Sequence, residues 1–308
     1  MMKEISFFRN SHYEGKVLNT TVFLPEEGAP KAVVVLLHGL AEHFGRYRRF
    51  AESLTAQGVA LCGHDHLGHG EAVPENERGF FREKNGWETV CRDGASLVKR
   101  MRKDYPDSSI ILMGHSMGSF MARTIYLRGM VALDGLILSG TGNMSRLIVT
   151  GGKLVGKWIA LWRGKDKVSP MLTSLALGAY DKPFKGEGKN AWISSQPEEI
   201  ARYNADPLCG FPVKIGMFLD MFDGLSYIFN MKNVRLADKS VPILFVSGKE
   251  DPVGDMGKGV TTAYRAFCEA GVQDVSMILY DGCRHEILND SCREETEKDI
   301  LTWLFERI

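Results

Sequence analysis

The sequence lacks the features that mark several other protein classes. It contains no run of about 18 apolar residues for a membrane-spanning helix, and its first ten residues lack the long apolar core of a signal peptide. It also has no Gly-x-Gly-x-x-Gly dinucleotide motif and no Walker phosphate loop. Lysine plus arginine and aspartate plus glutamate number 38 each, so no global charge favours nucleic acid. We therefore expect a soluble, cytoplasmic protein with no cofactor and no nucleic-acid partner.

Disulfide and metal motifs are missing as well. The six cysteines show no Cys-x-x-Cys pair or framework spacing, so we expect reduced thiols, with Cys62 in a buried strand. His64-Asp65-His66 and His69 do not have the spacing of a common metal cluster, and Gly68 and Gly70 favour a bent loop near the active-site edge instead. The sequence thus predicts no metal site.

The most informative motif present is Gly114-His115-Ser116-Met117-Gly118. An apolar run precedes it and a helix-compatible segment follows it, which is the context of a nucleophile elbow: a strained turn that exposes a serine above a sheet. Glycines on either side remove the Cβ atoms that would collide there. An inert serine at an ordinary strand–helix junction is the alternative. The context favours Ser116 as a nucleophile.

A serine nucleophile needs a histidine base and a carboxylate that orients it. In α/β-hydrolases these follow the serine in the order acid, histidine, each after a late strand. Asp251 follows the apolar run 243–248, and His285 follows the run 276–280 and precedes the terminal helix. Glu250 and Asp281 are alternative acids, but Asp281 is only four residues from His285 and Glu250 suits a solvated turn. Ser116, Asp251 and His285 are the predicted triad.

Two backbone N–H groups are candidates for stabilising the oxyanion that forms during hydrolysis. One belongs to Met117, directly after the nucleophile, and the other to Leu40, in the loop after the apolar run 32–37. The alternative for His38-Gly39 is a tight turn with no catalytic role.

Short apolar segments alternate with helical patterns along the chain, which predicts an α/β fold with a mostly parallel sheet and helices on both faces. The expected strands span 17–24, 32–37, 59–63, 110–114, 135–139, 243–248 and 276–280. The expected helices span about 46–57, 87–104, 116–129, 255–271 and 291–307. The gap between the strands at 135 and 243 is too long for one crossover. Residues 1–140 and 237–308 should form the core, and 141–236 an inserted helical cap.

One expected cap helix carries an apolar stripe at helical spacing, formed by Leu154, Val155, Trp158, Ile159 and Trp162. This stripe either packs on the domain below or, because residues 146–167 hold six Lys/Arg against one Asp, contacts a membrane surface transiently. Further along the cap, residues 217–222 are rich in Met and Phe, which fits core packing better than an acyl tunnel.

Four segments together resemble the monoacylglycerol lipases and the related bacterial lysophospholipase-like α/β-hydrolases, and the resemblance spans roughly residues 15 to 305. They are 38–47 (HGLAEHFGRY), 63–70 (GHDHLGHG), 114–118 (GHSMG) and 203–208 (YNADPL). The resemblance implies an α/β-hydrolase fold with a helical cap, a Ser–Asp–His triad, and ester substrates with one acyl chain on a small polar head.

The same resemblance implies that the head group binds near Glu42, Arg46, His115 and Tyr203. Glu42 and Arg46 can also pair with each other, so anchoring of the loop is the alternative. The chain departs from the family twice: Ser119 replaces a glycine, and Leu288 replaces the histidine found near the glycerol end of the mammalian-type lipases.

The sequence therefore predicts a cofactor-independent serine hydrolase acting on a small-molecule lipid ester. A prolyl-aminopeptidase-type peptidase on the same fold is one alternative, and Glu198, Glu199 or Asp206 in the cap would then hold the free amine. A ligand receptor that has lost turnover is the other. Acyl-chain length, physiological substrate and oligomeric state do not follow from the sequence.

Overall fold

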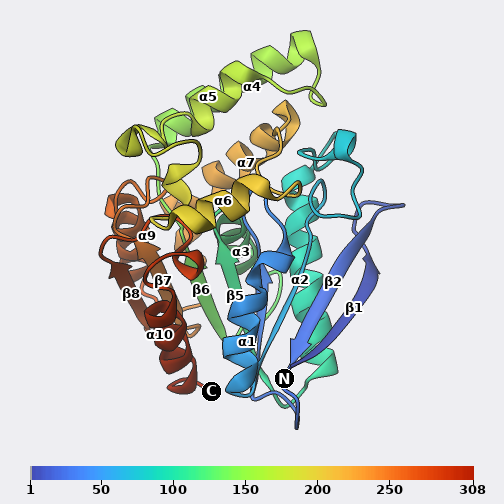
Figure 1. The fold of residues 1–308 in the computed structure, drawn as a ribbon, viewed down its shortest axis with the longest axis vertical. Helices are drawn as coiled ribbons and strands as arrows, with labels where there is room; N and C mark the ends of the chain where they lie inside the picture. Colours follow the sequence, from blue (N-terminus) through green and yellow to red (C-terminus); the bar gives the residue numbers. More distant parts are fainter. Residues whose placement is uncertain (1) are drawn as a thin grey trace.

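The computed structural model describes residues 2–308 and contains one mostly parallel sheet, in the strand order β1-β2-β4-β3-β5-β6-β7-β8 (Figure 1). The first two strands run antiparallel to their neighbours, and β3 through β8 are parallel. The strands are β1 Lys3–Asn10, β2 Val17–Leu24, β3 Ala32–Leu37, β4 Val59–His64, β5 Ser109–His115, β6 Gly135–Ser139, β7 Ile243–Gly248 and β8 Val275–Tyr280. The carboxyl ends of the parallel strands therefore share one edge of the sheet.

Helices cover both faces of the sheet, as the alternation of apolar segments predicts. Side chains alternate between the faces along each strand: Val33 and Val35 of β3 pack into one buried cluster, and Val34 and Leu36 into another. The first cluster includes α2 (Gly86–Asp104), α3 (Met117–Leu127) and α9 (Lys258–Glu269). The second includes α1 (Arg48–Ala56) and α10 (Arg293–Phe305). Two cores thus sandwich the sheet.

The predicted strands match the observed ones to within one residue at each end, but β1 was not predicted. This strand pairs with β2 at the edge of the sheet, and most of its side chains are exposed. An exposed edge strand has no buried face to impose an apolar alternation, so its sequence carries a weak strand signal.

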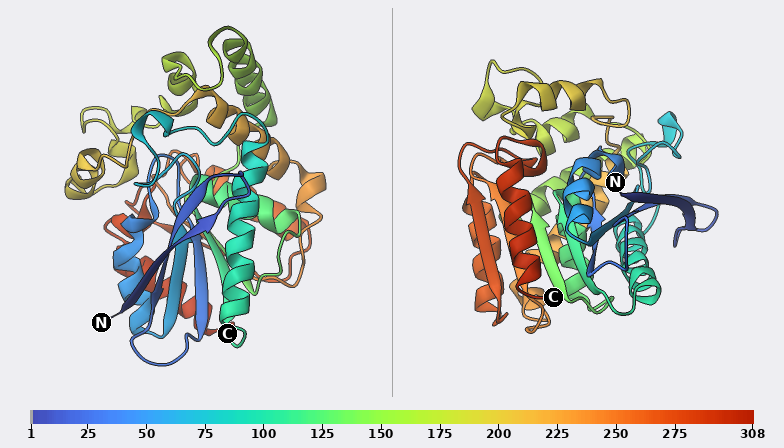
Figure 2. Two further views of the ribbon diagram at one scale, coloured as in Figure 1. Left: turned by 90° about the vertical axis from the view of Figure 1, so that its right-hand side faces the viewer. Right: turned by 60° about the horizontal axis from the view of Figure 1, so that its bottom comes forward.

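The segment between β6 and β7 contains helices instead of strands, and Figure 1 shows them above the carboxyl edge of the sheet. They are α4 Arg146–Arg163, α5 Pro170–Leu177, α6 Pro197–Ala205, α7 Ile215–Ile228 and α8 Met231–Val234. Helix α7 contacts α2 and α3 below it and α4 above it, so α4 is the outer layer (Figure 2). Among residues 2–308, no helix combines the length and apolarity needed to cross a membrane.

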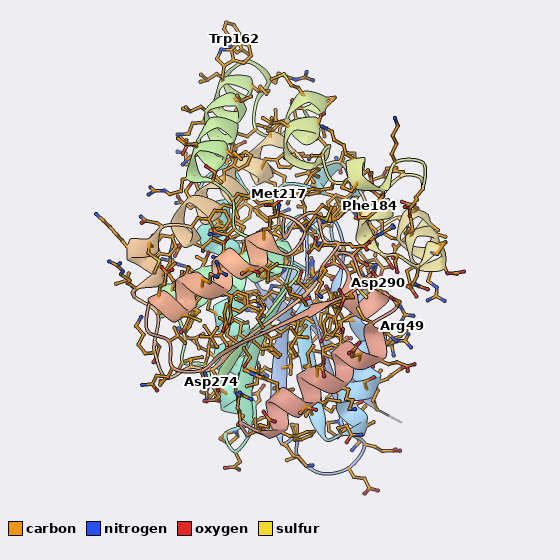
Figure 3. All side chains as sticks on the ribbon, turned by 90° about the vertical axis from the view of Figure 1, so that its left-hand side faces the viewer. Arg49, Trp162, Phe184, Met217, Asp274 and Asp290 are labelled. Carbon is orange, nitrogen blue, oxygen red and sulfur yellow. The ribbon has the colours of Figure 1, made fainter. Side chains whose placement is uncertain are left out.

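Helix α4 divides the predicted stripe between its two sides. Ile159 is buried and Val155 is partly buried, as the packing interpretation predicts, whereas Leu154, Trp158 and Trp162 are exposed. Trp158 and Trp162 are 62% and 79% exposed, and Trp162 projects from the far tip of the molecule (Figure 3). The opposite face packs on α7 through glycines: a Cβ at Gly152 would lie 2.9 Å from the Phe222 ring, and one at Gly156 2.9 Å from Leu219. Close approach at the glycine face therefore turns the large aromatic side chains toward solvent.

Candidate active site

Ser116 has the strained backbone that its motif predicts. It joins the end of β5 to the start of α3 with φ 53° and ψ −120°, a conformation that residues other than glycine adopt rarely. A Cβ at Gly114 would lie 2.3 Å from the Gly118 carbonyl oxygen, and a Cβ at Gly118 would lie 1.9 Å from the Leu37 carbonyl oxygen. Only glycine fits at either position. Ser119 is accommodated because its hydroxyl donates to the Ser116 carbonyl at 2.6 Å.

The structure brings Asp251 and His285 together from loops after β7 and β8. Nδ1 of His285 lies 3.0 Å from both carboxylate oxygens of Asp251, and both residues are buried. The Val253 N–H also donates to Asp251 Oδ1 at 2.8 Å, which holds the carboxylate in place. Burial opposes a charged imidazole, but the charge and hydrogen bond of Asp251, together with the charges of Glu286 and Glu42, outweigh burial and raise the pKa of His285 above its usual value.

The two alternative acids lie away from His285. Asp281 is 85% exposed and forms an ion pair with Lys249 at 2.6 Å. Glu250 is exposed on the same loop as Asp251. Neither residue lines the cavity that Ser116 and His285 share. The geometry therefore favours Asp251 as the partner of His285.

Ser116 and His285 face a common cavity of about 560 Å³ between the sheet edge and the helices above it. Much of the lining is apolar, and its apolar side chains include Phe120, Leu177, Phe211, Val213, Met221 and Val253. Polar groups, including Glu42, Tyr203 and Glu286, line another part. Met217 and Phe218 are buried outside this lining, as expected for core packing. The cavity has the composition of a site for an amphiphile.

The loop after β3 offers Leu40 N–H to this cavity. The N–H groups on either side are already engaged: Gly39 N–H donates to Glu42, and Ala41 N–H donates to His69 Nε2 at 3.2 Å. Met117 N–H is at the first position of α3, where helical N–H groups have no partner within the helix. Leu40 and Met117 both line the cavity beside Ser116. This arrangement is compatible with an oxyanion hole.

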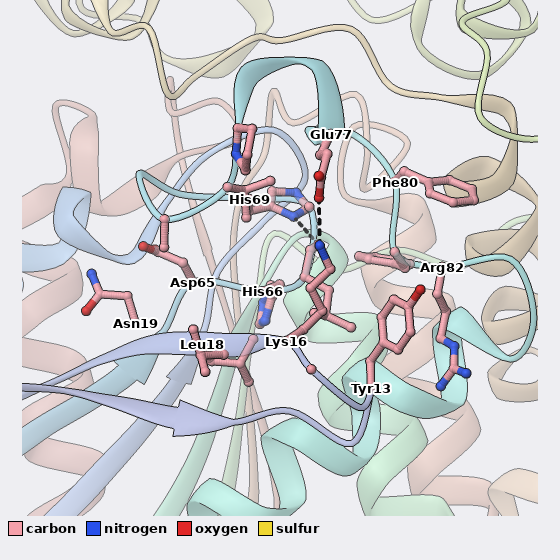
Figure 4. Close-up of a pocket in the computed structure, with 18 of the residues that line it drawn as sticks. Tyr13, Lys16, Leu18, Asn19, Asp65, His66, His69, Glu77, Phe80 and Arg82 are labelled. Atoms are coloured by element: carbon pink, nitrogen blue, oxygen red, sulfur yellow. Dashed lines mark hydrogen bonds and ion pairs between the residues drawn. The ribbon is translucent and has the colours of Figure 1, made fainter.

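A cluster of buried histidines supports that loop from below. His38 Nδ1–H donates to the Gly39 carbonyl at 2.8 Å, and His69 Nδ1–H donates to the Leu67 carbonyl at 3.0 Å, which leaves His69 Nε2 to accept from Ala41. Burial lowers the pKa of His69 to about 4, so the ring stays neutral. A second cavity of about 560 Å³ borders His66 and His69 on the side of the β1–β2 hairpin (Figure 4). The histidines thus position the loop.

The residues implied for the head group lie close together, but Arg46 is behind the cavity lining. Its guanidinium donates twice to Glu286 at 2.6 Å and once to Glu42 at 2.8 Å. Glu42 also accepts from Tyr47 at 2.9 Å, and the Tyr203 hydroxyl donates to the Ala41 carbonyl at 3.1 Å. Glu42, Tyr203 and Glu286 line the cavity, whereas Arg46 does not. The network itself anchors the loop, which is the alternative that the sequence left open.

His115 lines the cavity next to the nucleophile. Its ring centroid lies 4.7 Å from that of His285, and its Nδ1 lies 3.1 Å from the Ser139 hydroxyl. Burial, and after it the neighbouring His285, lower the pKa of His115 to about 4. His115 is therefore neutral at pH 7.

Sequence reasoning missed Glu286 and Trp192. The Trp192 ring centroid lies 4.9 Å from that of His285, and Trp192 lines the cavity from the segment between α5 and α6. No motif surrounds Trp192. Glu286 directly follows His285, and only the tertiary structure shows that Arg46 is its partner.

These features define an α/β-hydrolase: a serine lies on a strained strand-to-helix turn, and an acid and a histidine follow it at the carboxyl ends of later parallel strands. The chain belongs to the family described as "Serine aminopeptidase, S33", whose model matches residues 28–292.

Relatives and solved structures agree with that class. The chain is 28% identical to the monoglyceride lipase of Rattus norvegicus over 291 residues, covering 91% of this chain and 84% of that protein. It is 28% identical to the monoacylglycerol lipase of Mycolicibacterium smegmatis over 278 residues, covering 89% and 88%. A thermostable carboxyl esterase from Bacillus coagulans, solved in complex with glycerol, superimposes with a TM-score of 0.91 at 27% identity and covers 100% of this chain and 99% of that chain.

Proposed function

We propose that this protein is a serine hydrolase that cleaves the carboxylic ester of single-acyl-chain lipids, of the monoacylglycerol or lysophospholipid type. The observation that carries the proposal is the mostly apolar cavity, with polar groups in part of its lining, that both Ser116 and His285 line while Asp251 holds His285. The lipase names of the relatives support the same substrate class.

In the mechanism, Ser116 Oγ attacks the ester carbonyl carbon while His285 Nε2 takes the hydroxyl proton. Asp251 accepts from Nδ1 and stabilises the imidazolium. Leu40 and Met117 N–H groups donate to the oxyanion. The carbon–oxygen bond to the alcohol then breaks, and His285 returns the proton to the leaving oxygen. A water molecule repeats the sequence on the acyl-enzyme: His285 takes its proton, the fatty acid leaves, and the proton returns to Ser116.

Residues 141–236 act as a cap on a core formed by residues 1–140 and 237–308. In this proposal the apolar lining from the cap holds the acyl chain. The exposed face of α4, with Leu154, Trp158 and Trp162, contacts the lipid surface transiently. We retain a cytoplasmic location as the expectation from the sequence.

The head group binds at the polar lining, next to Glu42, His115 and Tyr203. Arg46 acts on this subsite indirectly, because its contacts are to the carboxylates of Glu42 and Glu286. Leu288 is buried and does not line the cavity, so it supplies no group to this subsite.

The peptidase alternative lacks its expected carboxylates. Glu199 pairs with Arg49 and Arg202, Asp206 pairs with His43, and neither these acids nor Glu198 line the cavity. The receptor alternative has no observation in its favour, because the Asp251–His285 pair and the strained Ser116 are both present.

Substrate assays test the proposal. We expect turnover of a monoacylglycerol or a lysophospholipid, and little or none of an aminoacyl anilide; preference for the anilide would favour the peptidase. Arg46→Ala and Tyr203→Phe should then be compared on a monoacylglycerol and on a p-nitrophenyl ester of equal chain length. A loss of kcat/KM confined to the monoacylglycerol supports a head-group role. Equal losses on both substrates would assign the residue to loop anchoring alone.

A further inference from the structure

Three side chains with different donor atoms converge where the loop after β3 meets the segment after α6. They are His43, Asp206 and Cys209, and their donor nitrogen, oxygen and sulfur atoms all lie within 4.8 Å of one another. Nε2 of His43 is 2.8 Å from Oδ2 of Asp206. The sequence predicted no metal site because His64-Asp65-His66 and His69 lack the spacing of a metal cluster. His43 lies more than 160 positions before Asp206 and Cys209, so no local motif joins the three residues.

The donor set matches the preferences of zinc, which binds imidazole nitrogen, thiolate sulfur and carboxylate oxygen. Zinc bond lengths of about 2.0 to 2.3 Å place tetrahedral donors about 3.3 to 3.8 Å apart. The widest donor pair would therefore close by up to roughly 1 Å, and the 2.8 Å contact between His43 and Asp206 would open by roughly 0.5 Å. Leu208 N–H donates to Asp206 Oδ1 at 2.8 Å, which fixes the carboxylate and keeps Oδ2 directed at His43.

The surroundings favour a divalent cation. Cys209 is under the electrostatic influence of three carboxylates, those of Glu42, Asp206 and Glu286, and of one guanidinium, that of Arg46. The side chains of His43 and Asp206 are 17% and 28% exposed, which leaves an approach from solvent.

We propose that His43, Asp206 and Cys209 form a zinc-binding site that joins the cap to the loop of the oxyanion hole, with water as the fourth ligand. Binding replaces the thiol proton of Cys209, which passes to solvent, and it requires the His43 tautomer with the proton on Nδ1 and the lone pair on Nε2. The ion would then bridge the two segments beside a contact that already joins them, the 2.9 Å hydrogen bond from Gly210 N–H to the Ala41 carbonyl.

The site has consequences for substrate access because both bridged segments border the catalytic cavity. Gly210 and Phe211, directly after Cys209, line that cavity, as do Ala41 and Glu42, directly before His43. A bound ion would therefore keep these two segments together at the edge of the cavity and would oppose their separation. The site is separate from Ser116 and does not depend on hydrolysis.

Cobalt(II) is the probe, because a Co(II)–thiolate bond gives a charge-transfer absorption that Co(II) on nitrogen and oxygen alone does not. The full-length protein is treated with a chelator, dialysed and titrated with Co(II), then with Zn(II). We expect the absorption to saturate at one Co(II) per chain, to disappear when Zn(II) displaces Co(II), and to be present equally in Ser116→Ala, which separates metal binding from catalysis.

Substitutions assign the ligands. Cys209→Ser should abolish the charge-transfer absorption, and His43→Gln or Asp206→Asn should weaken binding by at least about tenfold. Cys268→Ser, which alters the exposed cysteine on α9, is the matched control and should bind as the wild type does. Zn(II) should also raise the Tm of the wild type and of Cys268→Ser but not that of Cys209→Ser. Absence of the absorption in the wild type, or its persistence in Cys209→Ser, would overturn the proposal.

Discussion

Ser116 has a positive φ, and it lines the same cavity as His285. We explain the backbone strain by function, because the strained turn places the serine where a substrate would bind. Ser116→Ala should lower kcat by on the order of 10⁶, because the members of a triad act as a unit. Labelling with a fluorophosphonate, followed by intact-mass measurement, should give one adduct on the wild type and none on the variant. Ser119→Ala is the matched control and should still be labelled; an adduct on Ser116→Ala would remove Ser116 as the nucleophile.

The His285–Asp251 pair predicts the pH dependence of activity. His285 must be neutral to accept the serine proton. Its pKa is raised above the usual value of about 6.5, because Asp251, with smaller effects of Glu286 and Glu42, outweighs the opposing effect of burial. The kcat/KM of the wild type should therefore fall as pH drops through a value above 6.5.

Asp251→Asn removes the charge that raises this pKa, so the acidic limb should move to lower pH while kcat falls by roughly 10⁴. Unfolding midpoints measured in the same buffers would show that the fold persists across the range. An acidic limb that stays in place in Asp251→Asn would argue that another group controls it.

The turn between β5 and α3 shows how an element constrains its sequence. Gly118→Ala places a Cβ on the Leu37 carbonyl oxygen, and we expect it to lower the free energy of unfolding by at least about 2 kcal/mol. Gly151→Ala is the matched control: Gly151 is exposed on α4 with no atom within 4 Å of the added Cβ. It should raise the free energy of unfolding by roughly 0.5 to 1 kcal/mol, since alanine favours a helix. Denaturant unfolding measures both, and a neutral Gly118→Ala would contradict the close approach.

The face of α4 that carries Trp158 and Trp162 is exposed to solvent, so its binding to a lipid surface can be tested. The double variant Trp158→Ser/Trp162→Ser should bind lipid vesicles at least about tenfold more weakly and should hydrolyse p-nitrophenyl acetate at the wild-type rate. Phe8→Ser, on exposed β1, removes a comparable apolar side chain from a different part of the surface and should leave vesicle binding unchanged. Equal vesicle binding by the double variant and the wild type, in a flotation assay, would exclude α4 as the contact.

At the scale of the whole molecule, the catalytic cavity is lined both by residues of the core and by residues of the inserted segment 141–236. Because the lining is mostly apolar, we expect kcat/KM on p-nitrophenyl esters to rise with acyl length. Each buried methylene can contribute up to about 0.8 kcal/mol, which corresponds to a rise of up to about fourfold. The value of kcat/KM should fall once the acyl chain fills the cavity. A series from acetyl to palmitoyl esters measures this profile. Equal efficiency on acetyl and octanoyl esters would mean that the cavity does not hold the acyl chain.

The sequence alone determined the β–α alternation, the elbow at Ser116 and the order of Asp251 and His285, because each depends on short-range patterns. Buried strands read as apolar runs, and a turn with no room for Cβ atoms requires glycine at Gly114 and Gly118.

Only the tertiary structure decided which groups meet across distance. The engagement of Arg46 by Glu286, the support of the oxyanion loop by His69, and the convergence of His43 with Cys209 join segments that share no local motif. The direction of the Trp158 stripe was decided in the same way, because helical periodicity shows that a face is apolar but not which face meets a neighbour. On α4 the glycine face allows the closer approach to α7, and the tryptophans therefore point to solvent.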